Sequence, residues 1–256
     1  MLRINDLSFR YNKRSAPVLK GVNMELAEGE IGILLGKNGA GKTTLFKNIL
    51  GVLQPAGGTL SLNDSDLAQL TKKERARKIA YVPQHIHFGD LTVFDSVLMG
   101  RVSYFGLKAG PEDYAVVERI LSDMHLESYA MRNAEELSGG EQQKIAIARA
   151  MAQEPEMLVF DEPTGNLHIA NDLLIIEEAR RLAKEKSITI LSSLHDMNQA
   201  LDFGDRFFFI KDGVIKYSGG EEIISEEIIY DIFGICVRTV YIDGRKVIIG
   251  GKKHED

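Results

Sequence analysis

A glycine-rich octapeptide near the N-terminus carries residues suited to binding phosphate. Residues 36–43 read Gly-Lys-Asn-Gly-Ala-Gly-Lys-Thr, which fits the pattern G-x-x-x-x-G-K-[ST] between an apolar run and a helical pattern. Glycines let successive N–H groups point inward, and the following helix adds its positive N-terminal end. We predict that Lys42 reaches the β- and γ-phosphates and that the Thr43 hydroxyl ligates Mg²⁺. The residues predicted to bind the phosphates are Gly36, Lys37, Asn38, Gly39, Ala40, Gly41, Lys42, Thr43 and Thr44.

Two adjacent carboxylates follow the apolar run at residues 157–160. A buried parallel strand would place Asp161 and Glu162 at the C-terminal edge of a sheet, where doubly wound folds bind ligands. Alone, such a pair more often marks an ordinary strand followed by a polar loop. With the loop at 36–43 present, we predict that Asp161 holds Mg²⁺ and that Glu162 orients or deprotonates an attacking water.

A third segment, residues 137–142, reads Leu-Ser-Gly-Gly-Glu-Gln and precedes a helical pattern over 143–152. Ser138 and Glu141 stand in the S-x-x-E relation of a capping box, which leaves the paired glycines unexplained. A helix start that is capped by Ser138 and contains two glycines is also suited to bind a second anion of phosphate size. The residues predicted to contact the ligand here are Ser138, Gly139, Gly140 and Glu141.

Short apolar runs alternate with helical patterns, at residues 31–35 and 43–52, 157–160 and 173–183, and 188–191 and 197–203. This alternation predicts parallel strands covered on both faces, in a doubly wound α/β arrangement. Hairpin signals at 63–64, 212–213 and 243–244 predict antiparallel strands near the N-terminus and in the last quarter. Residues 89–151 carry helical spacing without a strand run, which predicts a helical insertion in one domain.

The composition limits the class of protein. The chain has 256 residues, 44% of them hydrophobic, with 31 Lys and Arg against 37 Asp and Glu, a net charge of −6. These values fit a globular domain, and the acidic balance argues weakly against nucleic acid as a partner. One cysteine, Cys236, excludes an intramolecular disulfide framework, and no apolar run approaches the length of a spanning helix.

Together, the three motifs resemble those of ATP-binding cassette (ABC) ATPases, in an order and spacing that match across essentially the whole chain. The resemblance implies an α/β fold over residues 1–256: a P-loop NTPase core with a mostly parallel sheet, an N-terminal antiparallel β subdomain and an inserted helical subdomain. It also implies hydrolysis of ATP with Mg²⁺.

Further site residues follow from the same resemblance. Tyr11 matches the aromatic residue that stacks on adenine, Gln84 the glutamine that meets Mg²⁺ and the attacking water, and His195 the histidine that contacts the γ-phosphate. Lys42, Gln84, Glu162 and His195 thus form the predicted catalytic set. His168 stands where the family usually has Asp at a contact between subunits, and we hypothesise that it makes coupling between subunits depend on pH.

The resemblance also implies partners. In the family, two protomers face head to tail, so each 137–142 segment closes over the ATP of the other protomer. Residues 91–101 resemble ATPases that serve importers of iron-siderophore, haem, cobalamin and related metal chelates, although Ser103 stands where those relatives often have Pro. The chain is therefore expected to dock on a separate permease at the cytoplasmic face of the membrane, with an extracytoplasmic binding protein as an indirect partner. A soluble ABC ATPase of iron-sulphur cluster assembly is the alternative.

Overall fold

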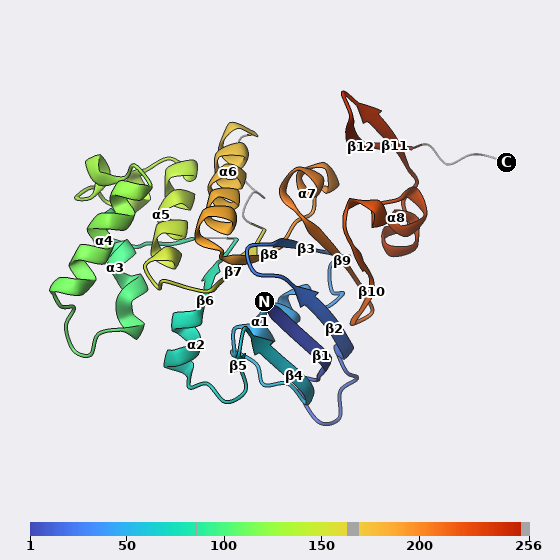
Figure 1. Ribbon diagram of the computed structural model, residues 1–256, viewed down its shortest axis with the longest axis horizontal. Helices are drawn as coiled ribbons and strands as arrows, with labels where there is room; N and C mark the ends of the chain where they lie inside the picture. Colours follow the sequence, from blue (N-terminus) through green and yellow to red (C-terminus); the bar gives the residue numbers. More distant parts are fainter. Residues whose placement is uncertain (85, 163–168, 252–256) are drawn as a thin grey trace.

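The computed structural model describes residues 1–84, 86–162 and 169–251 of the chain (Figure 1). Its centre is a six-stranded sheet with the order β10-β9-β3-β8-β7-β6. Neighbours from β9 to β6 pair in parallel, whereas β10 is antiparallel to β9. The strands of this sheet are β3 (Ile31–Leu35), β6 (Ile79–Val82), β7 (Met157–Asp161), β8 (Thr189–Ser193), β9 (Arg206–Lys211) and β10 (Val214–Gly219).

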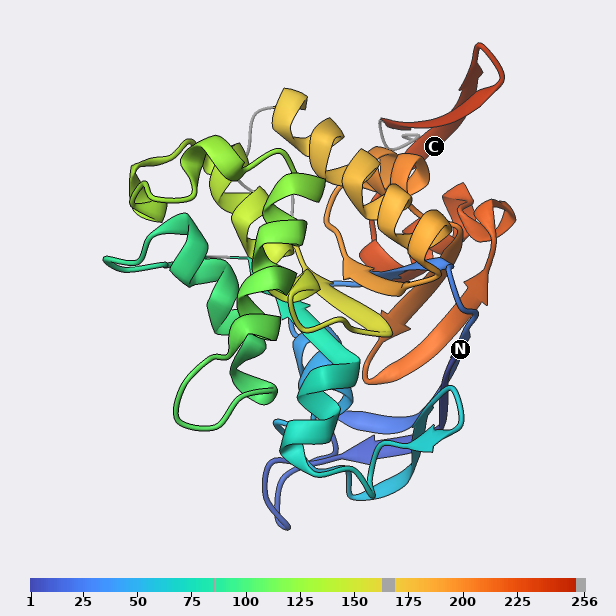
Figure 2. The same cartoon turned by 60° about the vertical axis from the view of Figure 1, so that its left-hand side comes forward.

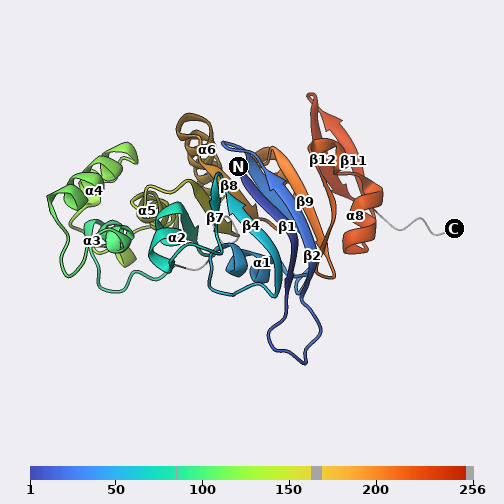
Figure 3. The ribbon, with the colours of Figure 1, turned by 60° about the horizontal axis from the view of Figure 1, so that its bottom comes forward.

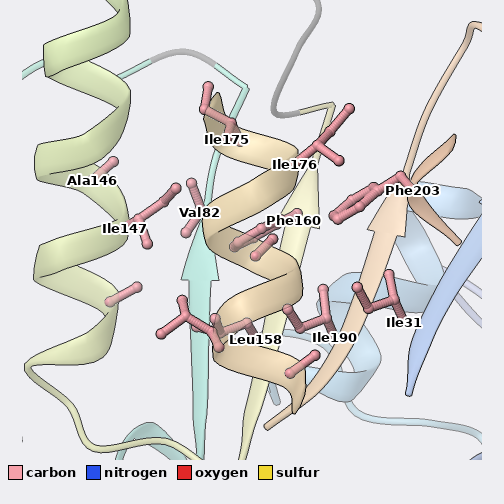
Figure 4. Packing of buried hydrophobic residues seen from close by; sticks show 14 of the residues in the cluster. Ile31, Val82, Ala146, Ile147, Leu158, Phe160, Ile175, Ile176, Ile190 and Phe203 are labelled. Atoms are coloured by element: carbon pink, nitrogen blue, oxygen red, sulfur yellow. The ribbon is translucent and has the colours of Figure 1, made fainter. Parts of the chain in front are cut away.

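The parallel strands are mostly apolar, with polar residues chiefly at their ends, because both faces of the central sheet are covered. On β7, Leu158 and Phe160 pack in one hydrophobic cluster, and Met157 and Val159 pack in the cluster on the other face. Figure 4 shows the first of these clusters, in which side chains from the sheet meet those of α5 and α6. The predicted alternation of buried strands and helices is therefore confirmed for this sheet.

A second, antiparallel sheet with the order β2-β1-β4-β5 lies against the core (Figure 3). Helix α1 (Lys42–Ile49) presents Leu45, Phe46 and Ile49 to the cluster that also buries Leu2 and Phe208, so the two sheets share one core. The strands of the second sheet are β1 (Leu2–Phe9), β2 (Leu19–Leu26), β4 (Gly57–Leu62) and β5 (Ser65–Asp66).

Helices cover the remaining face of the central sheet, opposite the antiparallel sheet (Figure 2). Residues 89–151 contain helices and no strand, as their spacing predicts, with one isolated bridge between Thr92 and Asn133. The further helices are α2 (Lys72–Lys78), α3 (Val93–Leu98), α4 (Pro111–Asp123), α5 (Gly139–Met151), α6 (Ile169–Lys186), α7 (Met197–Phe203) and α8 (Glu226–Phe233). Short 3₁₀ turns span Met99–Ser103, Glu127–Tyr129, Ala134–Glu136 and Glu221–Ile223. Within the three described ranges, every helix is too short or too polar to span a bilayer.

The three hairpin signals coincide with antiparallel connections. Asn63, Asp212 and Asp243 each have φ near +50°, and Gly213 and Gly244 follow with φ of 83° and 78°. At 212–213 and 243–244 both turn residues are left-handed, as in the tight turns that match the twist of a hairpin, whereas at 63–64 only Asn63 has positive φ. The three turns join β4 to β5, β9 to β10, and β11 (Val237–Ile242) to β12 (Arg245–Gly250).

Candidate functional site

The phosphate loop, residues 36–43, connects β3 to α1 in a conformation that requires glycine. A Cβ on Gly36 would lie 2.4 Å from the carbonyl oxygen of Ile210, and Gly39 and Gly41 have φ of 81° and 115°. The loop borders a pocket of about 300 Å³. Its lining residues are Val18, Lys37, Asn38, Gly39, Gly41, Lys42, Thr43, Thr44 and Glu162.

Lys42 is the buried cation of this pocket. Its side chain is largely covered, at 8% exposure, and Nζ donates to the carbonyl oxygen of Gly36 at 2.6 Å. Burial lowers the pKa of Lys42, while the negative charges of Glu162 and Asp161 oppose that shift. Because Glu162 lines the same pocket as Lys42, the loop and the acid pair form one site.

Asp161 ends β7 and is held by its two neighbouring strands. Ser193 Oγ, at the end of β8, donates to Oδ1 at 2.9 Å, and the Tyr81 hydroxyl of β6 donates to Oδ2 at 3.2 Å. Burial and the adjacent carboxylate raise the pKa of Tyr81 to about 12. Neither Ser193 nor Tyr81 was predicted from the sequence. The serines that follow the apolar run at 188–191 were a signal for Ser193, whereas Tyr81 lies inside the short strand β6 and had none.

Glu162 contacts two of the other predicted catalytic residues. Its backbone is left-handed, with φ of 53°, and its N–H donates to the carbonyl and the hydroxyl of Ser193 at 3.2 Å each. Gln84 Nε2 donates to Oε2 of the Glu162 carboxylate at 2.6 Å, and His195 Nε2 contacts Oε1. Parallel strand ends thus place a carboxylate, an amide and an imidazole beside the loop pocket.

The residues predicted to hold Mg²⁺ have a suitable donor set. Thr43 offers a hydroxyl, Gln84 an amide oxygen and Asp161 a carboxylate, and hard oxygen ligands of this kind suit Mg²⁺. Thr43 is exposed where it lines the pocket. Because the amide nitrogen of Gln84 donates to Glu162, the amide oxygen is the end of that side chain suited to a cation.

Tyr11, predicted to stack on adenine, lies at the edge of the loop region. Its hydroxyl is 3.2 Å from Thr44 Oγ1, and its ring meets Phe9 edge to face with centroids 5.0 Å apart. The side chain is 59% exposed, so a large part of its surface is open to a ligand. The structure therefore brings Tyr11 to α1, beside the phosphate loop.

The signature segment, residues 137–142, forms the start of α5. Ser138 and Glu141 make the predicted capping box: the Ser138 N–H donates to Glu141 Oε2 at 2.8 Å, and the Glu141 N–H donates to Ser138 Oγ at 3.4 Å. Gly139 is exposed and Gly140 partly so. Among the described residues, the lining of the loop pocket includes none of this segment. His168, for which pH-dependent coupling is hypothesised, lies outside the described residues.

Residues 19–165, more than half of the chain, match the ABC transporter family. The chain belongs to this family. It is 38% identical over 97% of both chains to an uncharacterised ABC transporter ATP-binding protein of Methanocaldococcus jannaschii. It is 34% identical to the petrobactin import ATP-binding protein of Bacillus anthracis, over 93% of this chain and 88% of the relative. A phosphonates import ATP-binding protein of Haloarcula marismortui is also 34% identical, over 86% and 84% of the two chains.

Solved structures of ABC proteins share this architecture over most of the chain. A transporter assigned to the metal-chelate ABC type, in an inward-facing conformation, contains a chain with a TM-score of 0.84 and 27% identity, and 98% of each chain is covered. A dimeric ATP-binding cassette in a post-hydrolysis state with ADP and phosphate gives a TM-score of 0.73 at 28% identity, covering 86% of this chain and 98% of the other. The chain is thus an ABC-type ATPase with the cassette fold predicted from its sequence.

Proposed function

We propose that this ABC ATPase hydrolyses ATP to drive a membrane importer of iron-siderophore, haem, cobalamin or a related metal chelate. The observation that carries the catalytic part is the position of Glu162 beside the loop pocket, in contact with Gln84 and His195. The likeness to a chain of a metal-chelate type transporter and to a petrobactin import protein supports the substrate class.

The side chains divide the reaction between them. Lys42 neutralises charge on the β- and γ-phosphates, because a buried ammonium interacts strongly with nearby oxygens. Glu162 accepts a proton from the attacking water through its carboxylate, while Gln84 and His195 fix the orientation of that carboxylate. His195 also contacts the γ-phosphate. Phosphoryl transfer to water needs little beyond this positioning and charge neutralisation.

Thr43, Gln84 and Asp161 are the proposed Mg²⁺ ligands. The chemistry supplied by the bound ion is neutralisation of the charge that develops on the phosphate oxygens. Ser193 and Tyr81 contribute indirectly, since their hydroxyls fix both oxygens of the Asp161 carboxylate.

A second copy of the chain completes the site. The signature segment lies outside the loop pocket of its own protomer, and its helix start presents N–H groups suited to phosphate. In a head-to-tail dimer, Ser138, Gly139, Gly140 and Glu141 of each protomer close over the ATP bound to the loop of the other. Tyr11 then stacks on adenine. The dimeric cassette with ADP and phosphate supports this arrangement.

The remaining partners are integral-membrane permease subunits, with an extracytoplasmic binding protein acting through them, at the cytoplasmic face of the membrane. The relatives named above for import support this placement over a role in iron-sulphur cluster assembly.

Pull-down of the full chain from detergent-solubilised membranes tests the choice between import and cluster assembly. A polytopic membrane protein bound to the chain supports import, whereas a soluble scaffold pair supports assembly. Competition of metal chelates and phosphonates for uptake then identifies the substrate class.

Glu162→Gln tests the catalytic role. The amide keeps the size of the side chain but cannot accept the proton of water, so this variant should bind ATP normally, hydrolyse it about 10²–10⁴-fold more slowly, and accumulate as an ATP-bound dimer in size-exclusion chromatography. The matched control is Glu156→Gln, which should hydrolyse ATP normally. Glu156 is a partly exposed glutamate before β7 that pairs with Lys78. Near-normal turnover of Glu162→Gln would remove Glu162 from the role of base.

A further inference from the structure

The C-terminal hairpin, β11 and β12, lies at the end of the molecule opposite α3 and α4, beside α7 and α8 (Figures 1 and 3). It buries Val237 and Ile248 in the large hydrophobic cluster, whereas Tyr241 near its tip is 68% exposed. Among the described residues that line the loop pocket, none belongs to the hairpin. The catalytic roles proposed above therefore leave the hairpin without a function.

One cross-strand residue pair of the hairpin is hydrogen-bonded to neighbouring helices on the outer edge of each strand. Thr239 of β11 lies opposite Ile248 of β12, and the backbone groups of both point away from the partner strand. Asn198 of α7 donates from Nδ2 to the Ile248 carbonyl at 3.0 Å and accepts the Ile248 N–H on Oδ1 at 2.8 Å. On the other edge, the Thr239 N–H donates to Glu226 Oε1 of α8 at 2.7 Å. We call these two contacts, Asn198 with Ile248 and Glu226 with Thr239, the clamps of the hairpin. They satisfy backbone N–H and C=O groups at the strand edges that a two-stranded sheet leaves unpaired.

The Asn198 clamp lies close to the catalytic histidine along the chain. Asp196 caps α7 by accepting the Gln199 N–H at 2.8 Å, so residues 196–199 form a fixed first turn. His195 immediately precedes this cap and reaches Glu162 with Nε2. A displacement of the first turn of α7 therefore moves the adjoining backbone that carries His195.

We propose that Asn198 is a positioning residue for ATP hydrolysis and that the C-terminal hairpin is the support against which it holds His195. This inference rests on the proposed catalytic role of His195. The amide of Asn198 is suited to the task because it can donate and accept at once, which fixes α7 against one backbone unit of β12. Within the part of the chain that the structure describes, the side chain of Asn198 is hydrogen-bonded to Ile248 and not to the loop or Glu162, so it acts through His195.

The support is itself anchored away from α7. Lys246 of β12 donates from Nζ to the carbonyl of Glu221 at 2.9 Å, and Glu226 holds β11 to α8. Helix α8 is in turn fixed to the central sheet, since Asp231 pairs with Lys211 of β9 at 3.0 Å and with Lys216 of β10 at 2.6 Å. The contact of Asn198 with Ile248 therefore connects the start of α7, through the hairpin and α8, to β9 and β10 at the edge of the central sheet. This connection does not involve β8.

Steady-state kinetics of Asn198→Ala in the full chain tests the proposal. We expect kcat to fall by about tenfold, with KM for ATP within about twofold of wild type, because small displacements of a catalytic group slow the reaction more than binding. Asn198→Asp keeps the acceptor for the Ile248 N–H and loses the donor, so its kcat should lie between those of Asn198→Ala and wild type. Glu226→Ala weakens the support on its α8 side without touching the Asn198 contacts, so kcat should fall by less than in Asn198→Ala. Glu227→Ala, at the exposed neighbouring position of α8, is the matched control and should leave kcat unchanged.

A double-mutant cycle separates positioning of His195 from general destabilisation. If Asn198 acts through His195, His195→Ala and the double variant His195→Ala/Asn198→Ala have the same kcat. Equal losses from Asn198→Ala in both backgrounds, or wild-type kcat in Asn198→Ala, would overturn the inference while leaving the proposed function intact. Wild-type kcat in His195→Ala would overturn both, and is thus a distinguishable result.

Discussion

The phosphate loop and the signature segment both lead into the start of a helix, but they differ in what surrounds that helix start. At the loop, the ends of β6, β7 and β8 bring Asp161, Glu162 and their partners beside α1, so charged side chains from distant sequence positions share one pocket. At the signature, Ser138 and Glu141 satisfy each other within the cap of α5. The loop side is thus equipped for chemistry, whereas the signature side offers mainly backbone N–H groups and exposed glycine.

A second capping box in the chain shows which part of the signature is specific. Thr71 and Glu74 make the same reciprocal bonds at the start of α2, with the Thr71 N–H donating to Glu74 Oε2 at 2.8 Å. Lysines rather than glycines follow Thr71. The box alone therefore stabilises a helix start, and the paired glycines after Ser138 are what would let a phosphate approach.

The largest effect is expected on the loop side. Lys42→Ala removes the buried ammonium that is proposed to face the phosphates. Loss of one partner of such a pair costs about 2–5 kcal/mol, so ATP affinity should fall by at least roughly thirtyfold. Fluorescent-nucleotide titration measures this change. Lys47→Ala, on the exposed side of the same helix, should bind ATP as wild type does. Equal affinities for wild type and Lys42→Ala would show that the loop side does not hold the phosphates.

A smaller effect is expected on the signature side, where two variants distinguish a loss of stability from a loss of ATP hydrolysis. Ser138→Ala and Thr71→Ala each remove the hydroxyl of a capping box and should each lower the free energy of unfolding by about 1 kcal/mol. Only Ser138→Ala should slow ATP hydrolysis, and neither should weaken ATP binding to the monomer. Denaturant unfolding and steady-state ATPase rates measure the two quantities. Equal hydrolysis by both variants would reduce the signature to an ordinary helix cap.

The smallest expected effect is a pH dependence of the α5 cap. Donation from the Ser138 hydroxyl and N–H lowers the pKa of Glu141 below its ordinary value of 4.5. A carboxylate whose pKa is lower in the folded state stabilises the protein above its unfolded pKa, and this stabilisation disappears as the pH falls through the folded pKa. The stability difference between wild type and Ser138→Ala should therefore be larger at about pH 7 than at about pH 3.5. An equal difference at both values would contradict this role of Glu141.

Local patterns predicted a large part of this molecule. The bounds of β3 and α7 agree with the apolar runs at 31–35 and 197–203, and three hairpins follow from pairs of turn residues, because these signals depend on neighbours in the sequence. The loop, the acid pair and the capping box were visible for the same reason. Their roles with nucleotide and metal stay predictions.

Contacts between distant strands were not predictable in the same way. That Ser193 and Tyr81 hold Asp161 depends on the strand order β8-β7-β6, which places residues far apart in sequence at one edge. The clamp of Asn198 on Ile248 joins residues 50 positions apart and needs the tertiary placement of a hairpin whose sequence shows only its own turn. Helix α2 and strand β6 are also too short to show a clear period.

Complementation between two inactive variants tests the central claim, that the loop of one protomer works with the signature of another. Lys42→Ala inactivates the loop, and Gly139→Asp places a carboxylate where phosphate would approach the signature. Each variant alone should be inactive, and mixing them should restore ATP hydrolysis, because one site of the mixed dimer combines an intact loop with an intact signature. A mixture that stays inactive, with mixed dimers shown to form, would contradict the composite site.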